Sequence, residues 1–213
     1  MIQRNYLFLL LILGSFDAHS ELNDYIYPKS QPSYSNYGTI GLIQMPTARS
    51  LSAGTIAFSW TDNKPYQRGS ILAYPFDWFE ASYQYADMEN ALYSSVVEFS
   101  GTQTYKDKSF DAKFIILKER HNLPALAVGF RDLAGSGYFS SEYIVATKKF
   151  NNIDYTLGLG WGYLGEDIGN PLIRIDESFR DRTLVSDTAG GEFNPGTYFS
   201  GPMGIFGGIE AII

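Results

Sequence analysis

The chain has 213 residues, a formal net charge of -7 and no cysteine. An acidic chain is a poor partner for a nucleic-acid backbone, and the lack of cysteine excludes disulfides, thiolate metal sites and a lipid anchor on cysteine. Aromatic residues make up 16% of the chain, with 16 tyrosines, and belts of Tyr and Trp are typical of proteins at membrane interfaces.

The N-terminus has the layout of a secretory signal peptide. Arg4 precedes an apolar run over residues 6–13, and the small residues Ala18 and Ser20 follow. A membrane-spanning helix needs about 20 apolar residues, which is more than this run provides. We therefore expect residues 1–20 to be a cleaved signal peptide rather than a membrane anchor.

Residues 21–53 are expected to lead into the folded domain, which we place at residues 54–213. Their first part, residues 21–37, is polar and rich in Pro and Ser, which predicts a flexible segment. The lead-in ends in a turn at Ala53-Gly54.

From Thr55 onward the chain repeatedly alternates bulky apolar residues with small or polar ones. Successive side chains of a β-strand point to opposite faces, so this period of two predicts strands. In the first of them, Ile56, Phe58 and Trp60 share one face. The eight candidate strands are residues 55–61, 69–76, 79–86, 110–118, 125–132, 141–150, 155–163 and 202–213.

The strand "YTLGLGWGY" (residues 155–163) has one bulky face and one face of glycine and threonine. Glycine weakens a strand unless something crowds that face. The concave side of a small soluble barrel is one such environment. A membrane barrel is the other, with the bulky face, including Tyr155, Trp161 and Tyr163, toward lipid and the small face toward the interior.

The phase of residues 141–150 is ambiguous, because apolar and polar residues do not separate cleanly there. We expect Tyr143 and Val145 to point outward and Glu142 and Lys148 to point inward.

The connections between the candidate strands alternate in length. Short turns are expected at residues 75–78, 119–124 and 151–154, and longer loops at residues 62–68, 87–108, 133–139 and 164–200. Short turns at one end and long loops at the other are typical of outer-membrane barrels. A bilayer also requires every exposed backbone group to be paired. The sequence therefore predicts an all-β fold, an antiparallel meander of about eight amphipathic strands forming an outer-membrane β-barrel or part of a larger one.

Several stretches resemble the YjbH-type exopolysaccharide and capsule-export proteins of Gram-negative bacteria. They include "GTIGLIQMPTAR", "YPFDWFEASYQY", "GFRDLAGSGYFSSEY" and "YTLGLGWGYLG", and the resemblance runs from about Gly38 to the end. It implies an outer-membrane β-barrel with a role in polysaccharide production or secretion. Its implied partners are polysaccharide, outer-membrane lipid and periplasmic polysaccharide-export proteins. Members of this family are usually longer, and the ending "GGIEAII" lacks a terminal aromatic residue, so we expect this chain to be the N-terminal part of a longer barrel.

Inward and loop positions supply the candidate polysaccharide contacts. Arg131 and Glu142 are expected to approach each other across a hairpin, either as a contact for sugar hydroxyls and uronates or as a structural charge pair. Tyr138 and Phe139 would offer stacking surfaces. The full set of lumen or polysaccharide-contact candidates is Glu80, Asp111, Lys113, Arg131, Asp132, Tyr138, Glu142 and Lys148.

The sequence offers no complete catalytic set. His121 is the one histidine after the signal peptide, so zinc hydrolysis and Ser-His-Asp catalysis both lack parts. Glycosidases need two carboxyl groups about 5 to 10 Å apart, but the candidate carboxylates are more simply read as lumen charges paired with cations. We expect no enzymatic activity, no cofactor and no metal. A passive conduit is the favoured function, a scaffold for periplasmic partners is the alternative, and a polysaccharide-modifying enzyme ranks last.

Overall fold

The computed structural model of the chain describes residues 31–182 and 195–211. Residues 1–30, which include the predicted signal peptide, lie outside the described residues. Helix is scarce in the described part: one α-helical turn, α1 (Val97–Ser100), and the short 3-10 helices η2 (Pro171–Arg174), η3 (Glu177–Phe179) and η4 (Pro195–Thr197). None of these helices is long and apolar enough to cross a membrane.

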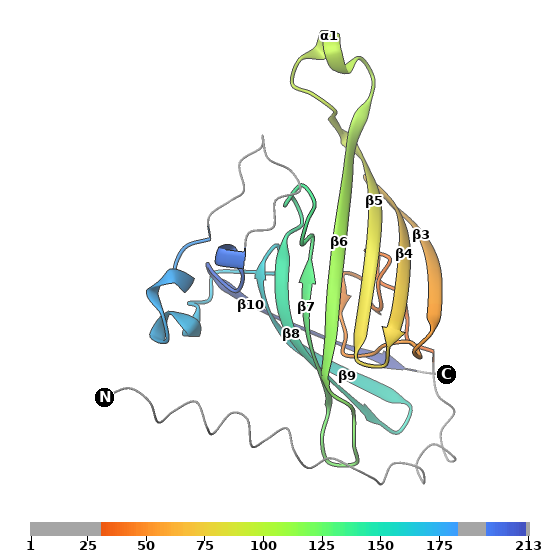
Figure 1. Cartoon of the computed structure of the whole chain (residues 1–213), viewed down its shortest axis with the longest axis vertical. Helices are drawn as coiled ribbons and strands as arrows, with labels where there is room; N and C mark the ends of the chain where they lie inside the picture. The colour runs from red at the N-terminus through yellow and green to blue at the C-terminus, as the bar shows by residue number, and fades with distance from the viewer. Residues whose placement is uncertain (1–30, 183–194, 212–213) are drawn as a thin grey trace. The chain divides into compact units, whose positions relative to one another are not determined.

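Eight consecutive strands form a single antiparallel meander that curls into a half-barrel (Figure 1). Within the described residues no ladder joins its edge strands, the first and the last of the meander. The predicted fold of about eight antiparallel strands is thereby confirmed. The strands are β3 (Thr55–Asn63), β4 (Tyr66–Phe76), β5 (Phe79–Leu92), β6 (Thr104–Leu117), β7 (Ala125–Arg131), β8 (Ser141–Phe150), β9 (Ile153–Gly162) and β10 (Met203–Ala211).

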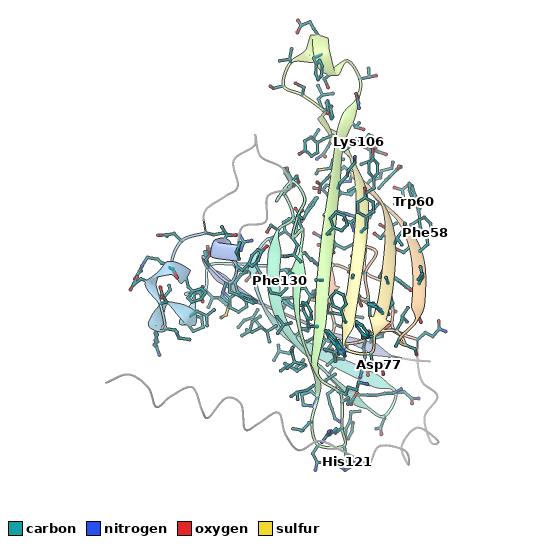
Figure 2. All side chains as sticks on the ribbon, in the orientation of Figure 1. Phe58, Trp60, Asp77, Lys106, His121 and Phe130 are labelled. Atoms are coloured by element: carbon teal, nitrogen blue, oxygen red, sulfur yellow. The ribbon has the colours of Figure 1, made fainter. Side chains whose placement is uncertain are left out.

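The two faces of the half-barrel differ in polarity in the way the alternation predicts. On the convex face of β3, Ile56, Phe58 and Trp60 are 78, 70 and 62% exposed, and Figure 2 shows Phe58 and Trp60 pointing away from the sheet. On the concave face of β4, Ser70 and Leu72 are buried. An exposed apolar face this broad is uncommon on a soluble monomer. The sheet therefore has its apolar surface outside and its polar surface inside.

The connections are sorted by length between the two ends of the strands with one exception, the two-residue turn at residues 64–65, which lies at the end of the long connections. Residues 77–78, 118–124 and 151–152 make the short turns, and residues 93–103, 132–140 and 163–202 make the long connections. In Figure 2, Asp77 and His121 mark the short-turn end, and Lys106 lies toward the opposite end.

Two predicted loops differ from the structure. The loop predicted at residues 87–108 is shorter, because β5 continues to Leu92 and β6 begins at Thr104. The loop predicted at residues 62–68 is wrong. The β3–β4 ladder continues through this segment to the pair Asn63↔Tyr66 and leaves a two-residue turn. The polar residues there look like a loop in the sequence, but they are ladder positions: Asp62 pairs with Gln67, and Thr61 pairs with Arg68.

The concave side of the half-barrel is occupied by the chain's own residues 33–51, called here the inner segment. Its only strands are β1 (Gly41–Leu42) and β2 (Met45–Pro46), which pair with each other. Tyr37, Ile40 and Ala48 of this segment are buried. Residues 31–37 belong to the part of the lead-in predicted to be flexible, yet Ser35 and Tyr37 are buried, because the concave face needs a partner for its polar groups.

The glycine face of β9 also turns toward the interior. A Cβ added at Gly158 would overlap the ring of Phe206, and one added at Gly160 would overlap Leu164. Phe206 and Leu164 pack in turn against a small core around Ala48 and Val145. The glycines thus make room for Phe206 from β10 and for Leu164 from the connection that follows β9. This explains why this face of β9 carries only small side chains.

Part of the long β9–β10 connection covers the convex face. We call residues 179–182 and 197–200 the covering segment. Trp161, predicted to face lipid, is only 2% exposed, and its ring packs edge-on against Phe199 at 5.1 Å between centroids. Phe130 of β7 contacts Phe199 in the same way, at 5.6 Å. The lipid-facing prediction for Trp161 is therefore wrong, because residues far along the chain fold over it.

Candidate functional site

Four of the predicted lumen residues do lie on the concave face. Cross-strand register places Glu80 of β5 directly opposite Lys113 of β6, and their charged groups are 2.7 Å apart and almost fully buried. Asp111 lies two residues before Lys113 on the same face, and Arg131 follows on β7. The sheet register thus brings these residues together as the alternation predicts.

These concave residues contact the inner segment. Lys113 donates from Nζ to the carbonyl of Arg49 at 2.8 Å, and Arg131 donates to the carbonyl of Gln44 at 3.3 Å. A cavity of only about 10 Å³ remains beside Glu80, Lys113 and Arg131, which is the volume of about one water molecule. With the inner segment in place, this surface is filled.

Small polar side chains of β3, β4 and β5 hold the other end of the inner segment. They donate to backbone carbonyls, which a chain without regular structure leaves unpaired. The donors are Ser59 to Gly38 at 2.9 Å, Thr61 to Asn36 at 2.9 Å, Ser70 to Tyr37 at 3.3 Å, and Gln84 to Tyr37.

Arg49 anchors the inner segment near the short-turn end of the sheet. Its guanidinium donates twice to Asp154 of β9, at 2.7 Å in each case, and once to Glu119 of the β6–β7 turn at 2.5 Å. Glu119 is also 3.1 Å from Lys148. A bidentate guanidinium–carboxylate pair fixes geometry as well as charge, so Arg49 holds this end of the segment both to strand β9 and to the β6–β7 turn.

Arg68, on the concave face of β4, is a buried cation that the sequence analysis missed. Its guanidinium carbon lies over the rings of Tyr37 and Tyr66, 4.6 Å from each centroid. Arg131 lies over the same Tyr37 ring at 4.3 Å. Arg68 fell inside the predicted loop at residues 62–68; the alternation of "YQRGSIL" into the following strand is the signal that could have revealed it.

Asp132 is held at the start of the β7–β8 loop with φ of 55°. Its amide donates to Asp111 at 2.9 Å, and its own carboxylate accepts from the amide of Phe139 at 3.2 Å. Burial, with a smaller contribution from the nearby carboxylate of Asp107, raises the pKa of Asp132 to about 7. Asp132 thus lies beside the concave cluster, as a loop residue rather than a strand residue.

The predicted phase of β8 is wrong. Thr147 accepts from the amide of Ala48 in the inner segment at 2.9 Å, so the odd-numbered residues of β8 face inward. Tyr143 faces inward beside Gly129, where a Cβ would overlap its ring. Glu142 and Lys148 therefore point to the convex side. The phase follows from the space that Gly129 leaves, which is a long-range property.

The predicted approach of Arg131 to Glu142 is also wrong, because the two side chains lie on opposite faces. Glu142 is instead buried under the covering segment, where Arg182 donates to both of its carboxylate oxygens at 2.7 and 2.9 Å. The amide of Phe199 adds a third hydrogen bond at 2.8 Å. No local signal in the sequence links residue 142 to residue 182.

The two aromatic residues of the β7–β8 loop differ in burial. Tyr138 is exposed, whereas Phe139 is buried and packs edge-on against Tyr37 at 5.9 Å. Phe139 is thus part of the aromatic cluster around the inner segment, and Tyr138 remains available at the surface.

In the described part of the chain, no three histidine, aspartate or glutamate side chains are grouped so that they could hold a metal ion. His121 is exposed at the short-turn end. The concave side presents buried guanidinium, ammonium and carboxylate groups beside aromatic rings, and such groups can bind a polar or charged ligand.

Comparison with known proteins gives one family and one close relative. Residues 33–211 match the family YjbH, described as "Exopolysaccharide biosynthesis protein YbjH". The chain is also 40% identical over 213 residues to a protein of Escherichia coli (strain K12) named "Uncharacterized lipoprotein YjbH". This alignment covers 98% of the chain and 30% of that relative, so the chain spans less than a third of the relative's length. No solved structure gives a significant match.

Proposed function

The chain belongs to the YjbH family of exopolysaccharide biosynthesis proteins, and from this premise we propose that residues 54–211 form part of an outer-membrane β-barrel that acts in exopolysaccharide production or secretion. The observation that carries the proposal is the exposed apolar face of the half-barrel, to which most of its strands contribute. A lipid bilayer is the environment in which such a face is stable.

Export to the outer membrane agrees with two further observations. The relative's printed name describes a lipoprotein, and lipoproteins are exported and membrane-associated. Apart from the two-residue turn between β3 and β4, short turns and long connections lie at opposite ends of the strands, which is the arrangement of outer-membrane barrels. We place the long connections on the cell exterior and the short turns in the periplasm.

In this proposal the free edges of the two outermost strands, β3 and β10, must pair with further strands. Unpaired N–H and C=O groups each cost several kcal/mol in hydrocarbon. The relative is more than three times as long as the aligned region, which leaves ample chain for further strands. We propose that strands outside residues 54–211 complete the barrel.

The role proposed for this barrel is passive, with contacts to the polymer and no bond chemistry. The concave residues Glu80, Lys113 and Arg131 would line the path of the polymer once the inner segment is displaced. Asp111 and Asp132 would lie beside them, and Tyr138 would meet the polymer at the exterior. Glu142 and Lys148 leave the set of lumen contacts because they point to the convex side.

A scaffold for periplasmic export proteins is the second candidate, and the filled concave face favours it. With the inner segment seated, about 10 Å³ remains beside the charged cluster, and a sugar ring needs far more space. In this alternative the exposed turn at residues 118–124 would be the contact surface.

The primary test compares cells with and without the full-length protein. We expect loss of the protein to lower the amount of released polymer relative to cell-retained polymer. The protein itself should fractionate with outer membranes and need detergent for extraction. Unchanged polymer release, or a protein that stays in the aqueous fraction, would contradict the proposal.

Two sets of substitutions separate the conduit from the scaffold. Glu80→Leu with Lys113→Met removes lumen charge without leaving a buried charge unpaired, an exchange that is often neutral for stability. His121→Ala with Asn122→Ala alters the exposed turn. A conduit should respond to the first pair and a scaffold to the second, measured as released polymer at equal protein level.

A further inference from the structure

Two buried cations on the concave side differ from the others in the described residues. Lys113, Arg182 and Arg49 each lie 2.7 Å from a carboxylate oxygen. Arg68 and Arg131 are 3 and 4% exposed, yet neither forms an ion pair within the described part of the chain. Asp111 interacts with Arg131 electrostatically, but no carboxylate of the described residues makes a direct ion pair with either group. A buried cation without a directly paired anion is costly, so both guanidinium groups can accept an anionic partner.

Both guanidinium groups also retain unused hydrogen-bond donors. Arg68 has no acceptor for its buried Nε, and Arg131 has none for its buried Nη2, among the described residues. The bonds they do make are long and go to backbone carbonyls, 3.4 Å from Arg68 to Asn36 and 3.3 Å from Arg131 to Gln44. These carbonyls belong to the inner segment. If the inner segment were displaced, the guanidinium groups of Arg68 and Arg131 would lose these hydrogen-bond acceptors.

The ring of Tyr37 contacts both guanidinium groups without accepting a hydrogen bond from their unused donors. Both lie over this one ring, at 4.6 and 4.3 Å from its centroid. Arg68 additionally lies over Phe139 at 5.2 Å, and Arg131 lies 5.8 Å from the ring centroid of Tyr143. Aromatic faces and guanidinium groups therefore line the space that Tyr37 fills.

We propose that Arg68 and Arg131 form a clamp for a carboxylate-bearing sugar residue of an acidic polysaccharide, with Tyr37 occupying the clamp in this structure. A guanidinium fork matches a carboxylate in shape and charge. The rings of Tyr66, Phe139 and Tyr143 supply flat apolar surfaces against which the C–H face of a sugar can pack. The inference rests on the proposed function and adds the substrate class, a polymer containing uronate-like residues.

Displacing Tyr37 does not require opening the barrel sheet. The inner segment joins no ladder of the eight-stranded sheet, and side-chain donors such as Ser59, Thr61 and Ser70 hold its carbonyls near Tyr37. Water or sugar hydroxyls can take over each of these hydrogen bonds. In this structure the inner segment occupies the clamp. The site becomes accessible when the polymer replaces the inner segment.

The test measures binding of tri-galacturonate, a carboxylate-bearing oligosaccharide, to the purified full chain in detergent by isothermal titration calorimetry. Tyr37→Ala empties the clamp and should bind at least about tenfold more tightly than the native chain. Adding Arg131→Gln to Tyr37→Ala should abolish that gain, and adding Arg131→Lys should retain part of it. Arg180→Gln is the matched control, because Arg180 is exposed and lies outside the concave face.

Maltotriose and inorganic phosphate serve as control ligands in the same titrations. The clamp predicts no gain for neutral maltotriose and weaker binding of phosphate than of tri-galacturonate. Equal gains for neutral and acidic sugars, or a gain that survives Arg131→Gln, would overturn it, and so would phosphate binding as tight as that of the sugar. If Arg131→Gln loses the β-sheet circular dichroism signal, Arg68→Gln replaces it with the same expected loss.

This binding test is separable from the test of the proposed function. If tri-galacturonate does not bind to Tyr37→Ala while polymer release still depends on the protein, the clamp is wrong and the proposed function stands. If tri-galacturonate binds as expected while polymer release is independent of the protein, the site is real and the secretion role is wrong.

Discussion

At the scale of single residues, Glu142 carries a buried charge whose partner comes from 40 positions along the chain. Removing one member of a buried, hydrogen-bonded pair leaves the other charge uncompensated. We expect Glu142→Gln to lower the free energy of unfolding by about 3 to 5 kcal/mol, measured by denaturant titration in detergent.

The matched control is Glu177→Gln. Glu177 pairs with Arg180 at 2.7 Å, but both side chains are exposed, and exposed pairs contribute about 1 kcal/mol or less. Equal effects of the two substitutions would show that Glu142 is not buried in an ion pair.

Asp132 should make stability depend on pH. Burial raises its pKa from 3.8 to about 7, so between these values the folded protein holds a proton that the unfolded chain releases. The resulting stabilisation is fully present below about pH 4 and is lost as pH rises through about 7.

The measurement compares the unfolding midpoint of the native chain with that of Asp132→Asn across pH 4 to 8. The native chain should lose stability over this range relative to the variant, and Asp167→Asn, in an exposed loop, should behave like the native chain. A difference between native and Asp132→Asn that does not vary with pH would contradict the raised pKa.

At the scale of elements, the register between β7 and β8 depends on one glycine. Gly129 pairs with Tyr143, and a Cβ at residue 129 would overlap the tyrosine ring. We expect Gly129→Val to destabilise the fold by about 1 to 3 kcal/mol, the usual cost of overpacking. Unfolding by denaturant measures this cost, and Gly169→Ala, with open space around it, should change stability by less than about 0.5 kcal/mol.

The inner segment is the element whose anchoring can be tested most directly. The chain has no cysteine, so a single Ala48→Cys reports on this segment alone through maleimide labelling. Ala48 is buried, and we expect slow labelling that accelerates by about tenfold or more when Arg49→Gln weakens the anchor to Asp154 and Glu119.

An exposed cysteine at Ser52 serves as the control for this labelling experiment. It should react rapidly with and without Arg49→Gln. Fast labelling of Ala48→Cys in the native background would mean that the inner segment does not stay on the concave face.

At the scale of the whole molecule, the apolar convex face determines the environment in which the protein is stable. Phe58 is 70% exposed on β3. If this face meets lipid, Phe58→Lys should reduce stability in phospholipid vesicles by about 2 to 4 kcal/mol, the cost of a cation near the bilayer midplane.

Phe99, in α1 beyond the barrel strands, is equally exposed, and Phe99→Lys should change stability little because this residue lies outside the apolar belt. Folding into vesicles, followed by denaturant titration, compares the two variants. A Phe58→Lys protein that is as stable as Phe99→Lys, and soluble without detergent, would argue against a lipid-facing surface.

The sequence by itself determined the strands and the polarity of their faces. Alternation is a local property, since each side chain of a strand points opposite to its neighbours. It therefore located eight strands and brought Glu80, Lys113 and Arg131 to one face. It failed where polar residues continue a ladder, at the β3–β4 turn and at the outer ends of β5 and β6, and so it missed Arg68. It also gave the wrong phase for β8, where apolar and polar residues do not separate cleanly.

Only the tertiary structure decided what covers each face. The inner segment on the concave side, the burial of Trp161 and the partner of Glu142 all depend on contacts between residues far apart in the chain. Such contacts leave no periodic signal, because they depend on which side chains the sheet register and the space beside a glycine allow to meet. Local alternation therefore predicts which residues share a face of the sheet where apolar and polar residues separate cleanly, as they do not in β8. The folded structure decides whether that face meets solvent, the inner segment or the covering segment.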